Sequence, residues 1–186
     1  MALFVIEHLE PRVYPWCKLE YAHLSKWVGK QNLLFTNTTN SFLKTIARVE
    51  KKKAKQLSFE KPCLLDPEAS TLLTPALARK FQTFIFGGIL GDDPPRARTI
   101  AELSALDLPY PRFNLGKEQM STDTAVIVTQ RIVDGKKLNK LHFQQGITIE
   151  LSDSESVELP YKYILVNNKP LLAPGLVDML KHQKGF

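Results

Sequence analysis

The chain has 186 residues, of which 44% are hydrophobic, and a formal net charge of +6. This length and apolar content suit one compact α/β domain of ordinary size. Cys17 and Cys63 form no CxxC pair, which argues against a disulfide scaffold. The positive charge is compatible with an anionic or nucleoprotein partner but does not identify one.

The N-terminal segment, MALFVIEHLE, turns acidic too early for a signal peptide. No apolar run approaches the roughly 20 residues that are needed to span a bilayer. We therefore expect a soluble, cytoplasmic protein that makes no membrane contact. The histidines at 8, 23, 142 and 182 lack ligand spacing with either cysteine, so no metal site is predicted.

Apolar runs and amphipathic segments alternate along the chain as far as Val133. The runs predict strands at residues 3–6, 32–36, 62–65, 83–86 and 112–115, and the amphipathic segments predict helices at 17–28, 41–55, 72–80, 100–106 and 121–133. Such alternation predicts a mostly parallel sheet with helices on both faces.

The pattern changes beyond Gly135. Residues 147–151 and 156–161 are two expected strands around a polar loop, and residues 174–182 form an expected terminal helix. These elements predict a C-terminal extension of about residues 146–186, a β-hairpin and a helix, within one domain that spans residues 1–186.

Ligands of open α/β sheets bind at the carboxyl ends of the strands. The loops expected at that edge are residues 65–70, 87–95 and 115–124, and each contains small polar or turn-forming residues. There is no GxxxxGK[ST] motif, and GGILG is not GxGxxG. The nucleotide triphosphate and dinucleotide interpretations therefore lose their main support.

Two of these segments, FIFGGILGDD at 84–93 and RFNLGKEQMSTDTAVIVTQRI at 112–132, resemble knot motifs of the SPOUT methyltransferases. The motifs IEHLEP, WCKLEY and NLLFTN extend the resemblance to nearly the whole chain. They are similar to a small, single-domain branch that includes the fungal enzyme methylating an arginine of small-subunit ribosomal protein three. The resemblance implies a C-terminal trefoil knot, at about residues 62–134.

The cofactor that the resemblance implies is S-adenosylmethionine, enclosed by the three loops. Backbone groups of the 115–120 loop would face the adenine, and the glycine loop would face the ribose and methionine part. The residues expected to bind it are Leu65, Asp66, Pro67, Phe86, Gly87, Gly88, Ile89, Leu90, Gly91, Asp92, Leu115, Gly116, Gln119, Met120, Ser121, Thr122 and Thr124.

An arginine acceptor is fully protonated in water, so methyl transfer to it calls for carboxylates that grip the guanidinium and accept a proton. The expected catalytic residues are Asp92, Asp93, Glu7, Asp66 and Asp123. Three of them have a structural alternative. Glu7 can be a solvated strand end, Asp66 a turn former before a proline, and Asp123 a partner of a helix dipole.

Three classes of function stay open. The leading one is a protein arginine methyltransferase that acts on a ribosomal protein. The second is an RNA methyltransferase, which the positive charge would assist, although the chain has no separate RNA-binding domain. The third is a non-catalytic binding module on ribosomes. We favour a monomer over a homodimer, because residues 147–181 can cover the surface that relatives use to dimerise.

Overall fold

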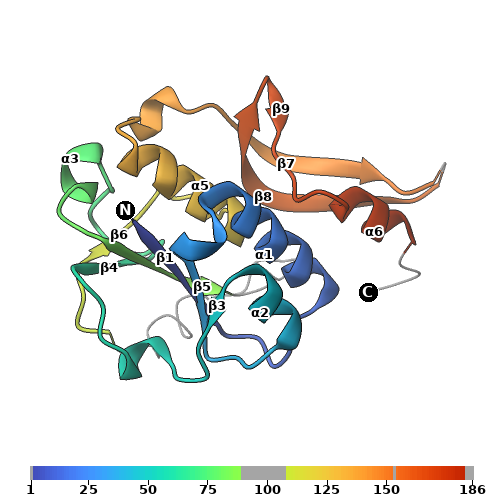
Figure 1. The fold of residues 1–186 in the computed structure, drawn as a ribbon. Coiled ribbons are helices and arrows are strands. Elements are labelled where there is room, and N and C mark those ends of the chain that lie inside the picture. The colour runs from blue at the N-terminus through green and yellow to red at the C-terminus, as the bar shows by residue number, and fades with distance from the viewer. Residues whose placement is uncertain (1, 89–107, 153, 183–186) are drawn as a thin grey trace.

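The structure is a computed structural model, and it describes residues 2–88, 108–152 and 154–182. Its main body contains a six-stranded parallel sheet of order β3-β2-β1-β5-β4-β6 (Figure 1). The strands are β1 (Leu3–His8), β2 (Leu33–Thr36), β3 (Arg48–Val49), β4 (Pro62–Leu65), β5 (Thr83–Gly88) and β6 (Arg112–Phe113). The parallel sheet expected from the alternating pattern is confirmed.

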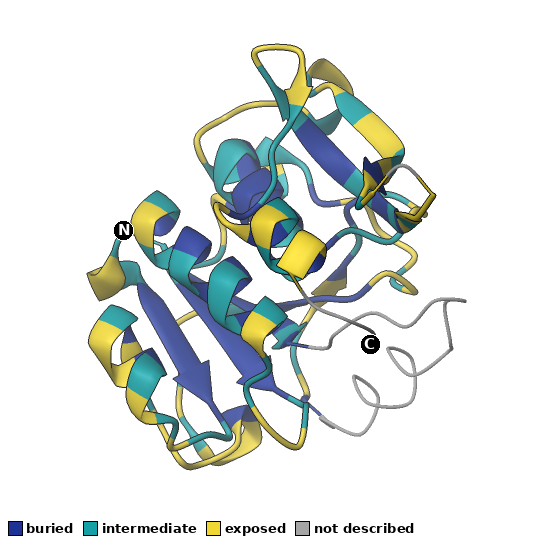
Figure 2. Ribbon diagram, turned by 90° about the vertical axis from the view of Figure 1, so that its right-hand side faces the viewer, coloured by how far each residue is buried: buried dark blue, intermediate teal, exposed yellow. Residues whose placement is uncertain are grey.

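The central strands are apolar along nearly their whole length, as strands covered on both faces must be. In β1, Phe4 lies opposite Leu33 of β2 and opposite Phe84 of β5. All three side chains are buried, and Figure 2 shows the sheet as a nearly continuous buried layer.

The described helices of the main body pack on one face of this sheet. They are α1 (Pro15–Val28), α2 (Ser41–Ile46), α3 (Pro75–Ala78) and α5 (Thr122–Val133). Three short 3-10 turns, η1 (Lys30–Asn32), η2 (Ala54–Gln56) and η3 (Leu138–Lys140), lie in the connections. Their core joins Ile6 of β1 to Leu24 of α1 and Val126 of α5. This face carries the larger of the two cores of the sheet.

The other face of the sheet has a smaller core, in which Val5 and Ile85 pack against Ala54 of η2 and against Leu108. Within the described residues, this face is therefore covered by a 3-10 turn and by loop residues, among them Phe59 and Tyr110. The helix expected at 100–106 lies outside the described residues. The expectation of helices on both faces is thus met for one face only in the part of the chain that the structure describes.

The C-terminal region forms a separate three-stranded antiparallel sheet of order β7-β8-β9, followed by α6 (Figure 1). Its elements are β7 (Phe143–Glu150), β8 (Ser156–Val166), β9 (Lys169–Pro170) and α6 (Leu176–His182). The inner face of this sheet packs with α6, and it also packs against Trp16 and Leu19 of α1. The predicted hairpin and helix are confirmed, although the strands are longer than expected and β9 was not predicted.

The helix expected at 41–55 is wrong beyond Ile46. Ala47 is extended and ends α2, and Arg48 and Val49 then pair with Leu34 and Phe35 of β2. The lysine run at 51–53 lies in an exposed turn. Pairing with an existing strand edge prevails over helix propensity here.

The helix expected at 72–80 is also too long. Leu72 and Leu73 are not helical, because Leu72 bridges Asn114 and the Leu73 amide donates to the Asn114 carbonyl over 3.0 Å. The helix begins only after Thr74, whose hydroxyl caps it, at Pro75. The trefoil knot stays a prediction, because the path of residues 89–107 lies outside the described part.

Candidate cofactor site at the carboxyl edge of the sheet

A cavity opens where β4, β5 and β6 end and α5 begins. Its apolar wall consists of Leu65, Phe86, Phe113, Leu115, Met120 and Ala125. Its remaining lining residues are Asp66, Pro67, Gly87, Gly116, Glu118, Gln119 and Thr122. A mostly apolar wall with a few polar groups is typical of a cofactor pocket. The cavity lies at the sheet edge where the sequence placed the ligand.

Most of the described residues expected to bind the cofactor line this cavity. They are Leu65, Asp66, Pro67, Phe86, Gly87, Leu115, Gly116, Gln119, Met120 and Thr122. Gly88, Ser121 and Thr124 are described but do not line it. Ile89, Leu90, Gly91 and Asp92 lie outside the described residues, as does the catalytic candidate Asp93.

Sequence reasoning missed three lining residues, Phe113, Glu118 and Ala125. Ala125 lies one helical turn beyond Thr122, so helical spacing could have found it. Phe113 is the last residue of its strand, as Leu65 is of β4, and the same strand-end argument applies to it. Glu118 carried no signal in the sequence.

Asn114 joins two of the loops that surround the cavity. Its side-chain carbonyl accepts from the Gly116 amide over 3.0 Å, and its side-chain amide donates to the Ala69 carbonyl over 2.7 Å. Its backbone amide donates to the Thr71 carbonyl over 2.9 Å. Gly116 itself has a φ of +108°, a conformation that side chains strain. The β6–α5 loop, residues 114–121, is therefore fixed at its start.

Asp66 lines the cavity and also holds its own turn together. One carboxylate oxygen accepts from the Glu68 amide over 2.9 Å, and the other accepts from the Arg112 guanidinium over 3.2 Å. This geometry matches the alternative of a turn former before Pro67. The carboxylate still borders the cavity, so a role toward the ligand stays a prediction.

Gly88 is glycine because of packing. A Cβ atom there would lie 2.5 Å from Tyr21 Oη and 2.7 Å from Ile6 Cγ2. The same Tyr21 hydroxyl lies 3.1 Å from Nδ1 of His8. Burial lowers the pKa of His8, so its imidazole is neutral at neutral pH. The end of β5 thus packs closely against Tyr21 of α1.

Glu7 is buried and does not line the cavity. It lies next to the smaller core, where one carboxylate oxygen accepts from the Ala54 amide over 2.9 Å and also from the Thr36 hydroxyl. It is not the solvated strand end that was the alternative. Its contacts show that it joins β1 to β2 and η2, and nothing in them brings it to the cavity.

Asp123 points toward α1 rather than into the cavity. Its carboxylate lies 2.8 Å from Nδ1 of His23, and it accepts from the Ser121 hydroxyl over 2.7 Å and from the Thr124 amide over 2.8 Å. Asp123 lies in the first turn of α5, where a carboxylate stabilises the helix. They agree with the structural alternative, and a catalytic role for Asp123 stays a prediction.

A second buried carboxyl, which was not predicted from the sequence, interacts with Asp123. Glu20 of α1 accepts from the Trp16 indole over 2.8 Å. Burial, with a smaller contribution from Asp123, raises the pKa of Glu20 well above its ordinary value. Burial also raises the pKa of Tyr163, and Glu20 and Asp123 add to this. This network lies between α1, α5 and β8.

The cysteines do not suit covalent chemistry. Burial raises the pKa of both the Cys17 and the Cys63 thiol to about 12, so each stays protonated at neutral pH. Among the described residues, no three His, Cys, Asp or Glu side chains gather closely enough to hold a metal ion. No helix in the same part of the chain combines the length and the apolarity that crossing a membrane requires.

Comparison with known proteins adds the chemistry. Residues 3–185 match the family model of the SFM1-like protein arginine N-methyltransferases. The protein arginine N-methyltransferase SFM1 of Saccharomyces cerevisiae is 34% identical, over 96% of this chain and 93% of that protein. A crystal structure of the yeast enzyme with SAH matches with a TM-score of 0.86 at 34% identity, covering 96% of this chain and 94% of the other.

The yeast enzyme with SAM also matches with a TM-score of 0.86 at 34% identity, covering 97% of this chain and 90% of the other. A dual-specific Trm10 from Thermococcus kodakaraensis matches with a TM-score of 0.56 at 14% identity, over 75% of this chain and 96% of that one, and shows the fold alone. The α/β fold expected from the SPOUT resemblance is thus confirmed. The chain belongs to the SFM1-like family of protein arginine N-methyltransferases.

Proposed function

We propose that this chain is an S-adenosylmethionine-dependent methyltransferase that methylates an arginine side chain of a protein. The observation that carries the proposal is the cavity at the carboxyl edge of the parallel sheet. It lies in a chain that shares 34% of its residues with a yeast arginine methyltransferase whose structures contain SAM and SAH.

The residues around the cavity fit this cofactor. Leu65, Phe86, Leu115 and Met120 supply apolar surface for an adenine ring, and the bare backbone at Gly87 lets a ligand approach closely. The carboxylate and amide groups of Asp66 and Gln119 can accept from or donate to ribose hydroxyls. When bound, the cofactor supplies an activated methyl group on a positively charged sulfur.

The protein then has to align the acceptor with that methyl group and exclude water. A guanidinium must also lose a proton before its nitrogen can attack, so carboxylates are needed next to the cavity. We propose Asp92 and Asp93, on the segment that follows β5, for this task. Asp66 is a further candidate, because it already borders the cavity.

The acceptor that we propose is an arginine of a ribosomal protein, with small-subunit ribosomal protein three as the first to test. This proposal rests on the branch of the SPOUT proteins that the sequence resembles. We further propose that the enzyme works in the cytoplasm as a monomer, with β7, β8 and α6 covering the surface that a dimer would use.

Methyl transfer from labelled S-adenosylmethionine to purified ribosomal protein and to ribosomal RNA, in separate reactions, tests the proposal. We expect label on the protein and none on the RNA. The double substitution of Asp92 and Asp93 by Ala should reduce transfer by at least about a hundredfold, the usual size of a general acid–base contribution, and lower SAH affinity by far less. Label on RNA alone would refute the arginine assignment, and unchanged turnover would refute the role of the two aspartates.

A further inference from the structure

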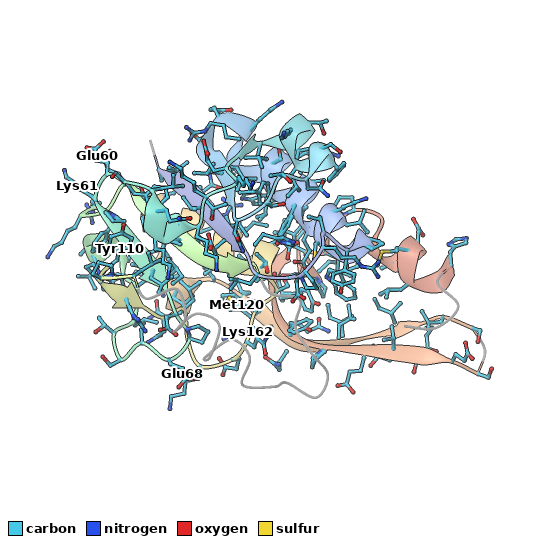
Figure 3. All side chains as sticks on the ribbon, turned by 90° about the horizontal axis from the view of Figure 1, so that it is seen from below. Glu60, Lys61, Glu68, Tyr110, Met120 and Lys162 are labelled. Carbon is cyan, nitrogen blue, oxygen red and sulfur yellow. The ribbon has the colours of Figure 1, made fainter. Side chains whose placement is uncertain are left out.

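Lys162 of β8 joins the C-terminal sheet to the β6–α5 loop. Its backbone amide donates to the Gln119 carbonyl over 2.8 Å, and Lys162 forms a parallel bridge with Met120. Figure 3 labels Met120 and Lys162, which lie close together where β8 passes the loop. Both Gln119 and Met120 line the cavity.

The Lys162 side chain reaches the same loop. Its ammonium lies 3.0 Å from a carboxylate oxygen of Glu118, which is also a lining residue. The hydrogen bond from Lys162 lowers the pKa of Glu118, so the Glu118 carboxyl is ionised at neutral pH. The ammonium also lies 4.6 Å from the centre of the Phe143 ring of β7. Phe143 and Glu118 together therefore fix its position.

We propose that Lys162 is a positioning residue of the methyltransferase, which holds the β6–α5 loop against the cofactor from outside the parallel sheet. The inference deepens the proposed function and rests on it. Two adjacent lining residues are held by the backbone of Lys162, and a third is held by its side chain. The Lys162 ammonium lies 3.0 Å from the Glu118 carboxylate, and this ion pair restrains the carboxylate from outside the parallel sheet.

The expected effect is modest, because the Glu118 side chain is 53% exposed and solvent screens the pair. Lys162→Met keeps the backbone bond and most of the apolar stem and removes the ammonium group. We expect SAH affinity to fall by about two- to fivefold, the range of an exposed ion pair. The loss should shrink in high salt, and Lys162→Arg should restore affinity.

A merely structural lysine would not show coupling to Glu118. In a double-mutant cycle, Lys162→Met should have no further effect in the Glu118→Gln background. Lys169→Met is the matched control, since Lys169 is an exposed lysine on the neighbouring strand β9. It should leave SAH affinity unchanged. Equal losses in the control, or a full effect of Lys162→Met without the Glu118 carboxylate, would overturn the inference.

Hydrogen exchange of the free protein separates this inference from the proposed function. Lys162→Met should speed the exchange of amides at 116–120, and the control should not. If the wild type binds no SAH, the proposed function fails while this measurement still tests the loop. Unchanged exchange at 116–120 in Lys162→Met would overturn the positioning role.

Discussion

The strands of the parallel sheet and those of the C-terminal sheet are buried to different extents. β1, β2 and β5 are buried along almost their whole length, whereas the second half of β7 and the first half of β8 alternate between more and less buried positions. A strand covered on both faces reads as an apolar run, and a half-covered strand reads as an alternation. The first sheet supplies the cavity, and the second supports the cavity from outside.

The two regions meet at α1. One side of this helix packs on the parallel sheet through Tyr21 and Leu24, and Trp16 and Leu19 pack on the C-terminal sheet. Substitutions in the parallel region, in the β6–α5 loop and on α1 should therefore have different effects.

Gly88→Val should destabilise the contact between the parallel sheet and α1. Its Cβ would overlap the Tyr21 hydroxyl and Ile6, and the Glu7 carbonyl lies 3.2 Å away. Overpacking of this kind costs about 1–3 kcal/mol. Urea unfolding should show the loss before any ligand is added. A variant as stable as the wild type would mean that the contact between β5 and α1 is loose.

Gly116→Ala should damage the cavity more than the fold. Its φ of +108° strains any side chain, although a Cβ there would meet only side-chain ends, at 3.6 Å or more. We expect a strain of about 1 kcal/mol, which corresponds to about fivefold weaker SAH binding in calorimetry.

Gly135→Ala is the matched control for that loop. Gly135 has a φ of +96°, and a Cβ there would meet nothing within 4 Å. The substitution should cost similar stability and leave SAH affinity unchanged. If both glycine variants weaken SAH binding equally, the loss comes from general destabilisation and not from the β6–α5 loop.

Glu20→Gln tests the contact of α1 with the C-terminal sheet. Its effect on stability should be smaller and should depend on pH. The folded-state pKa of Glu20 is raised by burial, so the stability that its protonated form provides is complete below the unfolded value of about 4.3. It is lost as the pH rises through the folded-state pKa. Glutamine keeps the acceptor for Trp16 and does not ionise.

The melting temperature of Glu20→Gln should therefore fall less between pH 5 and pH 9 than that of the wild type. Glu158→Gln serves as the control, because Glu158 is exposed on β8. Parallel pH profiles of the melting temperature for the wild type and Glu20→Gln would contradict a raised pKa of the buried Glu20 carboxyl.

The sequence predicted those parts of the fold that short apolar runs determine. The strand at 62–65 was predicted to the residue, and the helix at 121–133 to within one residue. The strand at 83–86 continues to Gly88. The order of the strands could not be read, because β1 lies beside β5 through pairings between residues far apart in the chain.

Some residues of the candidate site could likewise be predicted from the sequence, and others could not. Leu65, Gly87 and Leu115 were predicted because they follow apolar strands at one edge of the sheet. Lys162 was not, since it lies 44 residues from Glu118 and in a different sheet. Likewise, the helix predicted through Lys55 fails because pairing with β2 is a tertiary contact that periodicity does not contain.

The most direct test of the account is a hydrogen-exchange footprint of SAH on the intact chain. We predict slower exchange at residues 65–67, 86–88 and 114–120, which surround the cavity, and no change at 136–142, which lie beyond the end of α5. Protection confined to other segments, with these three unchanged at saturating SAH, would show that the cavity is not the cofactor site.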